Sequence, residues 1–459
     1  MANELLIRVY DVGLGDCIYV RIPGESGSNE EAFHMLIDCG TWSSEKFLEA
    51  ALEQLASELP TTPGGEKKRL DLVVVTHEHK DHIAGFDPKH WERFSVGNVW
   101  MNCAMNPKHP EAGKTRKVRK VAEKAVAGLG SLGAALSPSL AELVSIFEIG
   151  NAGAMETLRH ALLAGDGEPT YVHAGQTHEE LGIRLHPAAK IHILAPEFAF
   201  DRFYLGKAAQ TALKEIIGAA AFDAVEDEID PESETESEAA PAPVPEPVPE
   251  PKNISPATFR ALRARMQSNA LAFAELDGKL KNNSSVVLLI EWKGKRLLFV
   301  GDAEWHGAFK EGKMNGSWNV MWKERNKLLA QPVDFLKIGH HGSENATPWD
   351  MGSDKDTEEA RILEAILPLP KAGKKPTARA VVSTERGKYR TIPRGQLLKE
   401  IARRVDGATN YADDLRDYEP KDVADFVAYE RDWLKELQPP RTDFERIRKN
   451  SGYIDVTFD

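Results

Sequence analysis

The most constraining feature of this chain is the stretch VVVTHEHKDHIAGF at residues 73–86, where titratable side chains directly follow a run of apolar β-formers. Side chains at positions i and i+2 of an extended strand end point the same way, so His77 and His79 can meet one cation. Asp81 and His82 lie where the chain turns and can meet a second cation close by. Burying four such groups without a shared partner would be costly, so the stretch predicts a metal site rather than a polar loop with chance histidines. Imidazole and carboxylate suit zinc, with manganese and iron as alternatives.

Two later stretches also place candidate ligands after an apolar strand. LLFVGDAEW delivers Asp302, and FLKIGHHGS delivers His340 and His341. Taken alone, Asp302 would fit a helix N-cap, and the histidine pair would fit a turn with one hydrogen-bonded imidazole. Three strand ends that carry ligand-type residues in one chain predict instead a shared rim above two sheets.

The apolar patterns predict two groups of strands, interleaved with helices and split by a helical insertion. Strands are expected at 5–22, 34–40, 71–76, 98–102, 285–292, 295–302, 333–341, 378–384 and 452–458, and helices at 45–59, 111–163, 206–220, 256–276 and 392–405. This order predicts an α/β fold, a four-layer αββα sandwich with a large helical insertion. The expected divisions are two halves of that fold at 1–110 and 256–404, a mainly helical insertion with return strands at 111–222, a linker at 223–255, and a helical extension with a closing strand at 405–459.

Composition narrows the class of protein. The 459 residues exceed one ordinary core, and only three cysteines occur, without paired spacing. A disulfide framework is therefore not expected, and a reducing compartment fits. The N-terminus reads as a strand rather than as a signal peptide, and no window approaches 18 uninterrupted apolar residues. We expect a cytoplasmic protein that does not contact the membrane.

Charge is concentrated in two segments. Residues 223–251 hold 11 acids and no Lys or Arg, and without them the formal net charge of the chain changes from −13 to −2. This acidic, Pro-rich segment predicts a solvated linker, with docking of a basic protein partner as the alternative. The run from Lys114 to Lys124 has six basic residues in eleven and offers phosphate contacts to nucleic acid. A solvated helix face explains this run slightly better, because no aromatic residues interleave.

THEHKDH, GDAE and GHHGS, in that order, resemble the motifs of the metallo-β-lactamase superfamily. More narrowly, the chain resembles the hydrolase domain of ComEC-type competence proteins. YDVGLGDCIYV is similar to the DVGxGD opening of that subgroup, LIDCGT to its second strand, NNSSVVLLIEW to the strand before its aspartate, and RKNSGYIDVTF to its closing strand. The membrane channel of those proteins has no counterpart here, so the resemblance implies hydrolysis and not transport.

The resemblance implies a role for each matching residue. The first cation would be bound by His77 and His79, and the second by Asp81, His82 and His341, with Asp302 bridging the two. His340 would contact the substrate oxyanion, although the roles of His340 and His341 could be reversed. Asp38 would hydrogen-bond a ligand imidazole, with an ordinary turn aspartate as the alternative. Many superfamily members place a further histidine where Asn282 or Asn283 stands here, so the first cation would lack one strong ligand.

The expected reaction is hydrolysis by a metal-bound hydroxide. Two divalent cations about 3.5–4 Å apart lower the pKa of a bound water towards 7 and stabilise the entering and leaving oxygens. Asp81 could take or return the proton. The first hypothesis is a metal-dependent phosphodiesterase, with a nuclease as its narrower form. The alternatives are a hydrolase of a small ester, lactone or phosphorylated metabolite, and an effector module that binds a partner through the insertion or linker and whose metal site is structural or regulated.

Overall fold

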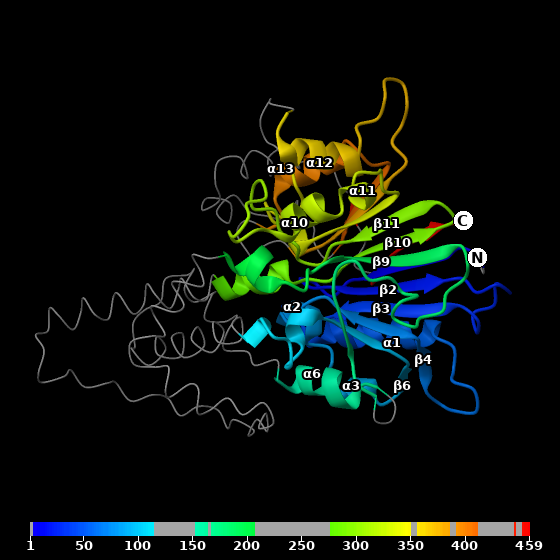
Figure 1. Cartoon of the computed structure of the whole chain (residues 1–459). Coiled ribbons are helices and arrows are strands. Elements are labelled where there is room, and N and C mark those ends of the chain that lie inside the picture. The colour runs from blue at the N-terminus through cyan, green and yellow to red at the C-terminus, as the bar shows by residue number, and fades with distance from the viewer. Residues whose placement is uncertain are drawn as a thin grey trace, which may run out of the picture.

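Two seven-stranded β-sheets form the centre of the computed structural model (Figure 1). The structure describes residues 3–113, 152–163, 167–206, 276–349, 356–385, 392–411, 445–446 and 452–459. The basic run at Lys114–Lys124, the linker at 223–255 and most of the predicted helical insertion and C-terminal extension lie outside these residues.

The first sheet contains strands from both the N-terminal and the C-terminal part of the chain. Its strands, in spatial order, are β16 (Tyr453–Phe458), β1 (Leu5–Tyr10), β2 (Cys17–Ile22), β3 (Phe33–Cys39), β5 (Leu72–Val75), β7 (Val99–Asn102) and β8 (Thr170–Val172). Pairing is antiparallel from β16 to β3 and parallel from β3 to β8.

The second sheet collects the later strands. In spatial order they are β15 (Glu445–Arg446), β14 (Gly407–Tyr411), β13 (Arg379–Ser383), β12 (Phe335–Ile338), β11 (Lys295–Phe299), β10 (Val287–Trp292) and β9 (Ala189–Ala195). Pairing is parallel from β15 to β11 and antiparallel from β11 to β9. The return strands expected within 111–222 include β8 and β9, which are edge strands of the two main sheets. A small parallel pair is formed by β4 (Lys68–Leu70) and β6 (Phe94–Val96).

Short helices fill the connections. The α-helices are α1 (Glu45–Glu58), α2 (Lys80–Ile83), α3 (Pro88–Trp91), α6 (Ala152–Glu156), α10 (Ser317–Glu324), α11 (Asn326–Leu329), α12 (Glu358–Ile366) and α13 (Gly395–Ala402), with residues 276–283 also helical. Single turns of 3-10 helix lie at Cys103–Met105 and His340–Gly342, and π-helical turns lie at Thr157–Ala161 and Asp201–Leu205. No helix in this described part of the chain is long and apolar enough to cross a membrane.

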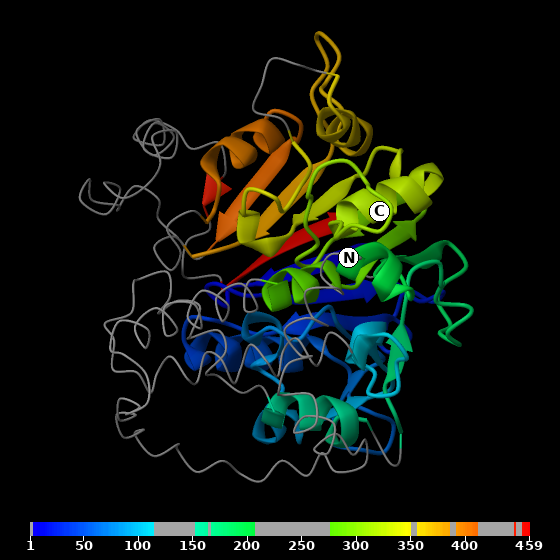
Figure 2. The ribbon, with the colours of Figure 1, turned by 60° about the vertical axis from the view of Figure 1, so that its left-hand side comes forward.

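The alternation of side chains along each strand explains how both faces of each sheet are buried. Ile7 and Val9 of β1 pack between the sheets with residues of β10 and β11, whereas Leu6 and Tyr10 pack with α1. In the second sheet, Leu289 faces outward into a core that includes α10, α12 and α13. Figures 1 and 2 show α1, α3 and α6 outside the first sheet and α10 to α13 outside the second. The predicted mixed α/β class is confirmed.

The sheets are joined where β5, β11 and β12 end. The amide of Val286, just before β10, donates to the carbonyl of Thr76 after β5 (3.0 Å). The amide of His340, after β12, donates to the carbonyl of Gly301 after β11 (3.2 Å). The three strand ends that carry candidate ligands therefore meet at one rim.

Candidate metal centre

The turn after β5 is held against the end of β3 by main-chain contacts. The amide of Asp16 donates to the carbonyl of Asp81 (2.9 Å), and the amide of Gly40 donates to the carbonyl of Asp16 (3.0 Å). A Cβ at Gly40 would collide with main-chain atoms of Asp81 and His82, so only glycine permits this approach. The close packing fixes α2 and the side chains that it carries.

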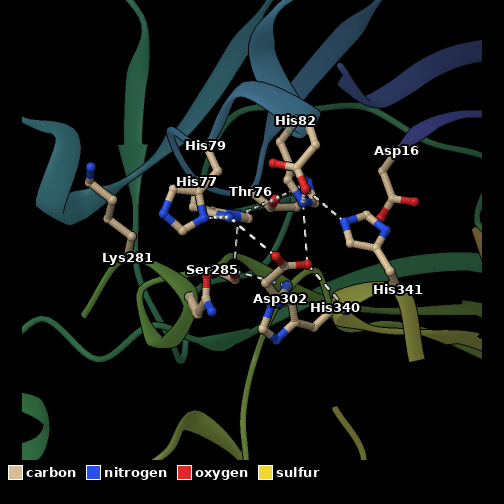
Figure 3. A network of polar contacts seen from close by, with 12 residues as sticks. Asp16, Thr76, His77, His79, His82, Lys281, Ser285, Asp302, His340 and His341 are labelled. Atoms are coloured by element: carbon tan, nitrogen blue, oxygen red, sulfur yellow. Dashed lines mark hydrogen bonds and ion pairs between the residues drawn. The ribbon is translucent and has the colours of Figure 1, made fainter. Parts of the chain in front are cut away.

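His77, His79 and Asp302 form the first group of potential ligands (Figure 3). Nε2 of His77 lies 2.9 Å from Nδ1 of His79 and 3.5 Å from Oδ2 of Asp302. Nε2 of His79 is buried and makes no hydrogen bond within the described chain. Burial, together with nearby His82, lowers the pKa of His77 to about 3. A neutral imidazole of this kind is the form that binds a metal.

Asp81, His82, Asp302 and His341 form the second group, whose ligand atoms lie within 4.8 Å of one another. Nε2 of His341 lies 2.7 Å from Oδ2 of Asp81, and Nε2 of His82 lies 3.2 Å from Oδ1 of Asp302. Nδ1 of His341 donates to the carbonyl of Ser383 (2.8 Å), so Nε2 is the ring nitrogen that could bind a cation. Oδ1 of Asp81 and Nε2 of His82 are buried and make no hydrogen bond with the residues described.

The two groups fit a pair of cations. They share Asp302, which uses one carboxylate oxygen towards each. Burial alone would raise the pKa of Asp302, but the imidazoles of His82, His340 and His77 hold it well below its ordinary value. Buried atoms without a hydrogen-bond partner are rare in proteins, and within the described chain the two groups hold three of them, namely Nε2 of His79, Oδ1 of Asp81 and Nε2 of His82. Neutral imidazole nitrogens and carboxylate oxygens are a donor set that suits zinc.

Asp38 orients His82 from behind. Its side chain accepts hydrogen bonds from Nδ1 of His82 (2.7 Å) and from the amide and hydroxyl of Thr76 (2.7 and 2.6 Å). The backbone of Asp38 is left-handed (φ 56°), a conformation that aspartate tolerates better than most residues. The carboxylate of Asp38 holds the proton of His82 on Nδ1, which leaves Nε2 as the nitrogen that could bind a cation in the second group.

His340 and His341 have different surroundings although they are adjacent in sequence. His341 is buried within the second group, whereas the side chain of His340 is 23% exposed and lies outside both groups. Both have left-handed backbones (φ 42° and 52°), and the amide of His340 donates to Oδ1 of Asp302 (3.1 Å). Burial would lower the pKa of His340, but Asp302 and Glu304 outweigh it and raise that pKa to about 9.

Residues 11–88 match the family model of the metallo-beta-lactamase superfamily. The match includes Asp16, Asp38 and the whole stretch from His77 to His82, and it points to a metal-dependent hydrolase. No curated protein matches the chain. Asp302 and His341 lie beyond the matched range, so their place in the site depends on the geometry described above.

Asn282 and Asn283, expected near the first cation of a superfamily site, instead contact Glu304. The Nδ2 atoms of Asn282 and Asn283 donate to Oε1 (2.9 Å) and Oε2 (3.1 Å) of Glu304. Within the described chain, no hydrogen bond or ion pair joins these asparagines to His77 or His79. The sequence interpretation missed Glu304, although its position two residues after Asp302 in GDAE was a signal.

A buried ion pair between the sheets was also missed. Nζ of Lys337, in β12, lies 2.8 Å from Oδ1 of Asp16, in the loop between β1 and β2. The two residues are 1% and 2% exposed. Lys337 is the one charged residue of FLKI, and a charge within an apolar strand could have marked it. Asp16 also lies near Asp38 and His82, so Lys337 supplies positive charge beside the candidate metal centre.

Proposed function

We propose that this protein is a metal-dependent phosphodiesterase that binds two divalent cations, zinc in preference to manganese or iron. The observation that carries the proposal is the convergence of two ligand groups on Asp302, each of which includes a buried polar atom that makes no hydrogen bond with the residues described. Bound cations would activate water and neutralise charge on phosphoryl oxygens. A phosphodiester suits this arrangement because its transition state carries negative charge on the non-bridging oxygens.

The protein side chains have separable tasks in this proposal. His77 and His79 supply neutral nitrogens, and Asp38 fixes the tautomer of His82. In Asp81, Oδ2 is engaged by His341, so Oδ1 is the atom that can accept or return a proton. His340, partly exposed at the edge of the cluster, is placed to contact a substrate oxygen.

Hydrolysis of bis-p-nitrophenyl phosphate by the purified protein, with zinc or manganese added, tests the proposal. We expect turnover that a chelator abolishes and that either His79→Ala or Asp302→Ala lowers by at least about 100-fold, with bound metal reduced. His160→Ala, which removes an exposed histidine far from these groups in sequence, is the matched control and should keep both activity and metal. Full activity in the metal-free protein would refute the proposal. Turnover of p-nitrophenyl acetate but not of the phosphodiester would favour a small-ester hydrolase.

The finer assignments are part of the same proposal. We propose the four-layer αββα arrangement of the superfamily, a kinship with ComEC-type hydrolase domains, the domain divisions given above and a cytoplasmic location, which the three free cysteines support. Nuclease activity through Lys114–Lys124 predicts cleavage of DNA or RNA that weakens when these basic residues are neutralised. Partner binding through the linker or insertion predicts that deleting residues 223–251 leaves hydrolysis by the pure protein unchanged.

A further inference from the structure

Glu304 is a buried carboxylate whose two oxygens each face two nitrogen atoms. Oε1 accepts from Asn282 Nδ2 (2.9 Å) and lies 3.4 Å from Nδ1 of His340. Oε2 accepts from Asn283 Nδ2 (3.1 Å) and lies 2.7 Å from Nε2 of His306. Glu304 is only 3% exposed, and burying a carboxylate is costly unless it is hydrogen-bonded in this way.

The orientation of the His340 ring has independent support. The hydroxyl of Ser343 donates to Oδ1 of Asn345 (3.0 Å), and a hydroxyl has only one proton to give. The Ser343 oxygen, 3.0 Å from Nδ1 of His340, is therefore the acceptor in that second contact. Nδ1 of His340 must therefore carry a proton, and the same nitrogen lies 3.4 Å from Oε1 of Glu304.

Nε2 is then the ring nitrogen of His340 that remains for other partners. His340 is 23% exposed and His306 17% exposed, whereas the carboxylate between them is covered. Figure 3 shows the His340 ring beside Asp302, on the opposite side from His82. The buried carboxylate of Glu304, which two asparagines hold in place, thus lies against the partly exposed imidazole of His340 at the edge of the candidate metal centre.

We propose that Glu304 is a positioning residue for the hydrolytic reaction: it fixes the His340 ring through Nδ1 so that Nε2 meets a phosphoryl oxygen of the substrate. This inference depends on the proposed phosphodiesterase function for its substrate. Asn282 and Asn283 hold Glu304 in place. They would therefore act on the substrate indirectly, through Glu304 and His340, and not as ligands of the first cation.

Kinetics of bis-p-nitrophenyl phosphate hydrolysis test the positioning role. We expect Glu304→Gln to lower kcat about 10- to 100-fold while KM changes less than about twofold and bound zinc is unchanged. In the His340→Gln background, Glu304→Gln should lower kcat no further, because its effect passes through His340. Glu311→Gln makes the same change at an exposed carboxylate paired with Arg202 and should have no effect. Independent, multiplicative losses in the double variant would overturn the proposal.

Imidazole 15N NMR of the zinc-loaded protein provides a readout that does not require turnover. The Nδ1 resonance of His340, assigned by its loss in His340→Gln, should show a bound proton and should shift in Glu304→Gln. An unshifted resonance would overturn the inference even if the enzyme is active. A shifted resonance in a protein that hydrolyses no phosphodiester would instead refute the proposed function and leave the Glu304–His340 contact standing. If Glu304→Gln does not fold, Glu304→Asp keeps the charge, shortens its reach and should give the same shift.

Discussion

Replacing Lys337 with methionine tests whether the buried ion pair with Asp16 holds the two sheets together beneath the candidate metal centre. Methionine keeps most of the apolar length of lysine and removes only the ammonium group. Asp16 would then be a buried carboxylate without its cationic partner, 2% exposed and still packed against the turn that carries Asp81.

The expected loss is large because the desolvation of Asp16 would no longer be compensated. Breaking a buried pair by removing one partner typically costs about 3–5 kcal/mol, whereas replacing both partners with uncharged groups of similar volume is often nearly neutral. We therefore expect Lys337→Met to lower the free energy of unfolding by about 3–5 kcal/mol. The double variant Asp16→Asn/Lys337→Met should recover about 2–3 kcal/mol of that loss.

Urea unfolding at neutral pH, followed by tryptophan fluorescence, measures the free energy of unfolding of each variant. An unchanged m-value would show that the mutation has not altered the compactness of the folded or unfolded state. Lys295→Met is the matched control, since Lys295 pairs with Asp334 (3.1 Å) but its side chain is 45% exposed. That variant should lose no more than about 1 kcal/mol. A loss below about 1 kcal/mol for Lys337→Met, or a double variant no more stable than the single one, would refute the reasoning.

Three further substitutions test the roles of His34, Asp38 and Gly40. Burial lowers the pKa of His34 to about 4 from an ordinary 6.5, so the unfolded chain binds the proton first, and stability should fall by up to about 3 kcal/mol as pH drops from 6.5 to 4. A pH series of unfolding curves should show that His34→Gln removes this part of the slope; an unaltered slope would contradict it. Asp38→Asn should weaken zinc binding about 10- to 100-fold in chelator competition, because His82 loses its orienting charge, and unchanged affinity would count against that role. Gly40→Ala should lower the free energy of unfolding by about 1–3 kcal/mol and reduce bound zinc. Gly278→Ala, whose Cβ meets nothing within 4 Å, is the control and should change neither stability nor bound zinc. Equal shifts of the melting temperature in the two variants would contradict this prediction.

The gathering of candidate ligands after β5 could be predicted from sequence because its information is local. An apolar strand followed by His77, His79, Asp81 and His82 specifies both burial and direction within ten residues. Asp302 followed from the same pattern at another strand end.

The remaining features depend on contacts that no local pattern encodes. Lys337 and Asp16 are 321 positions apart and meet only because the sheets pack face to face. The sequence left the roles of His340 and His341 open, since neighbours in an ordinary strand end cannot be distinguished; their left-handed backbones send the two rings to different places. The expectation for Asn282 came from its position before a strand, whereas its partner is decided by the buried charge of Glu304.

Under the proposed function, the consecutive left-handed histidines after β12 place stability and activity in opposition. A left-handed backbone costs an ordinary residue about 1–2 kcal/mol relative to glycine, and His340 and His341 bear this cost side by side. Selection for heat resistance alone would therefore favour glycine or asparagine in this turn, and selection for turnover would remove such changes. The turn is thus a place where the chain can become more stable only by giving up the side chains that approach the reacting groups.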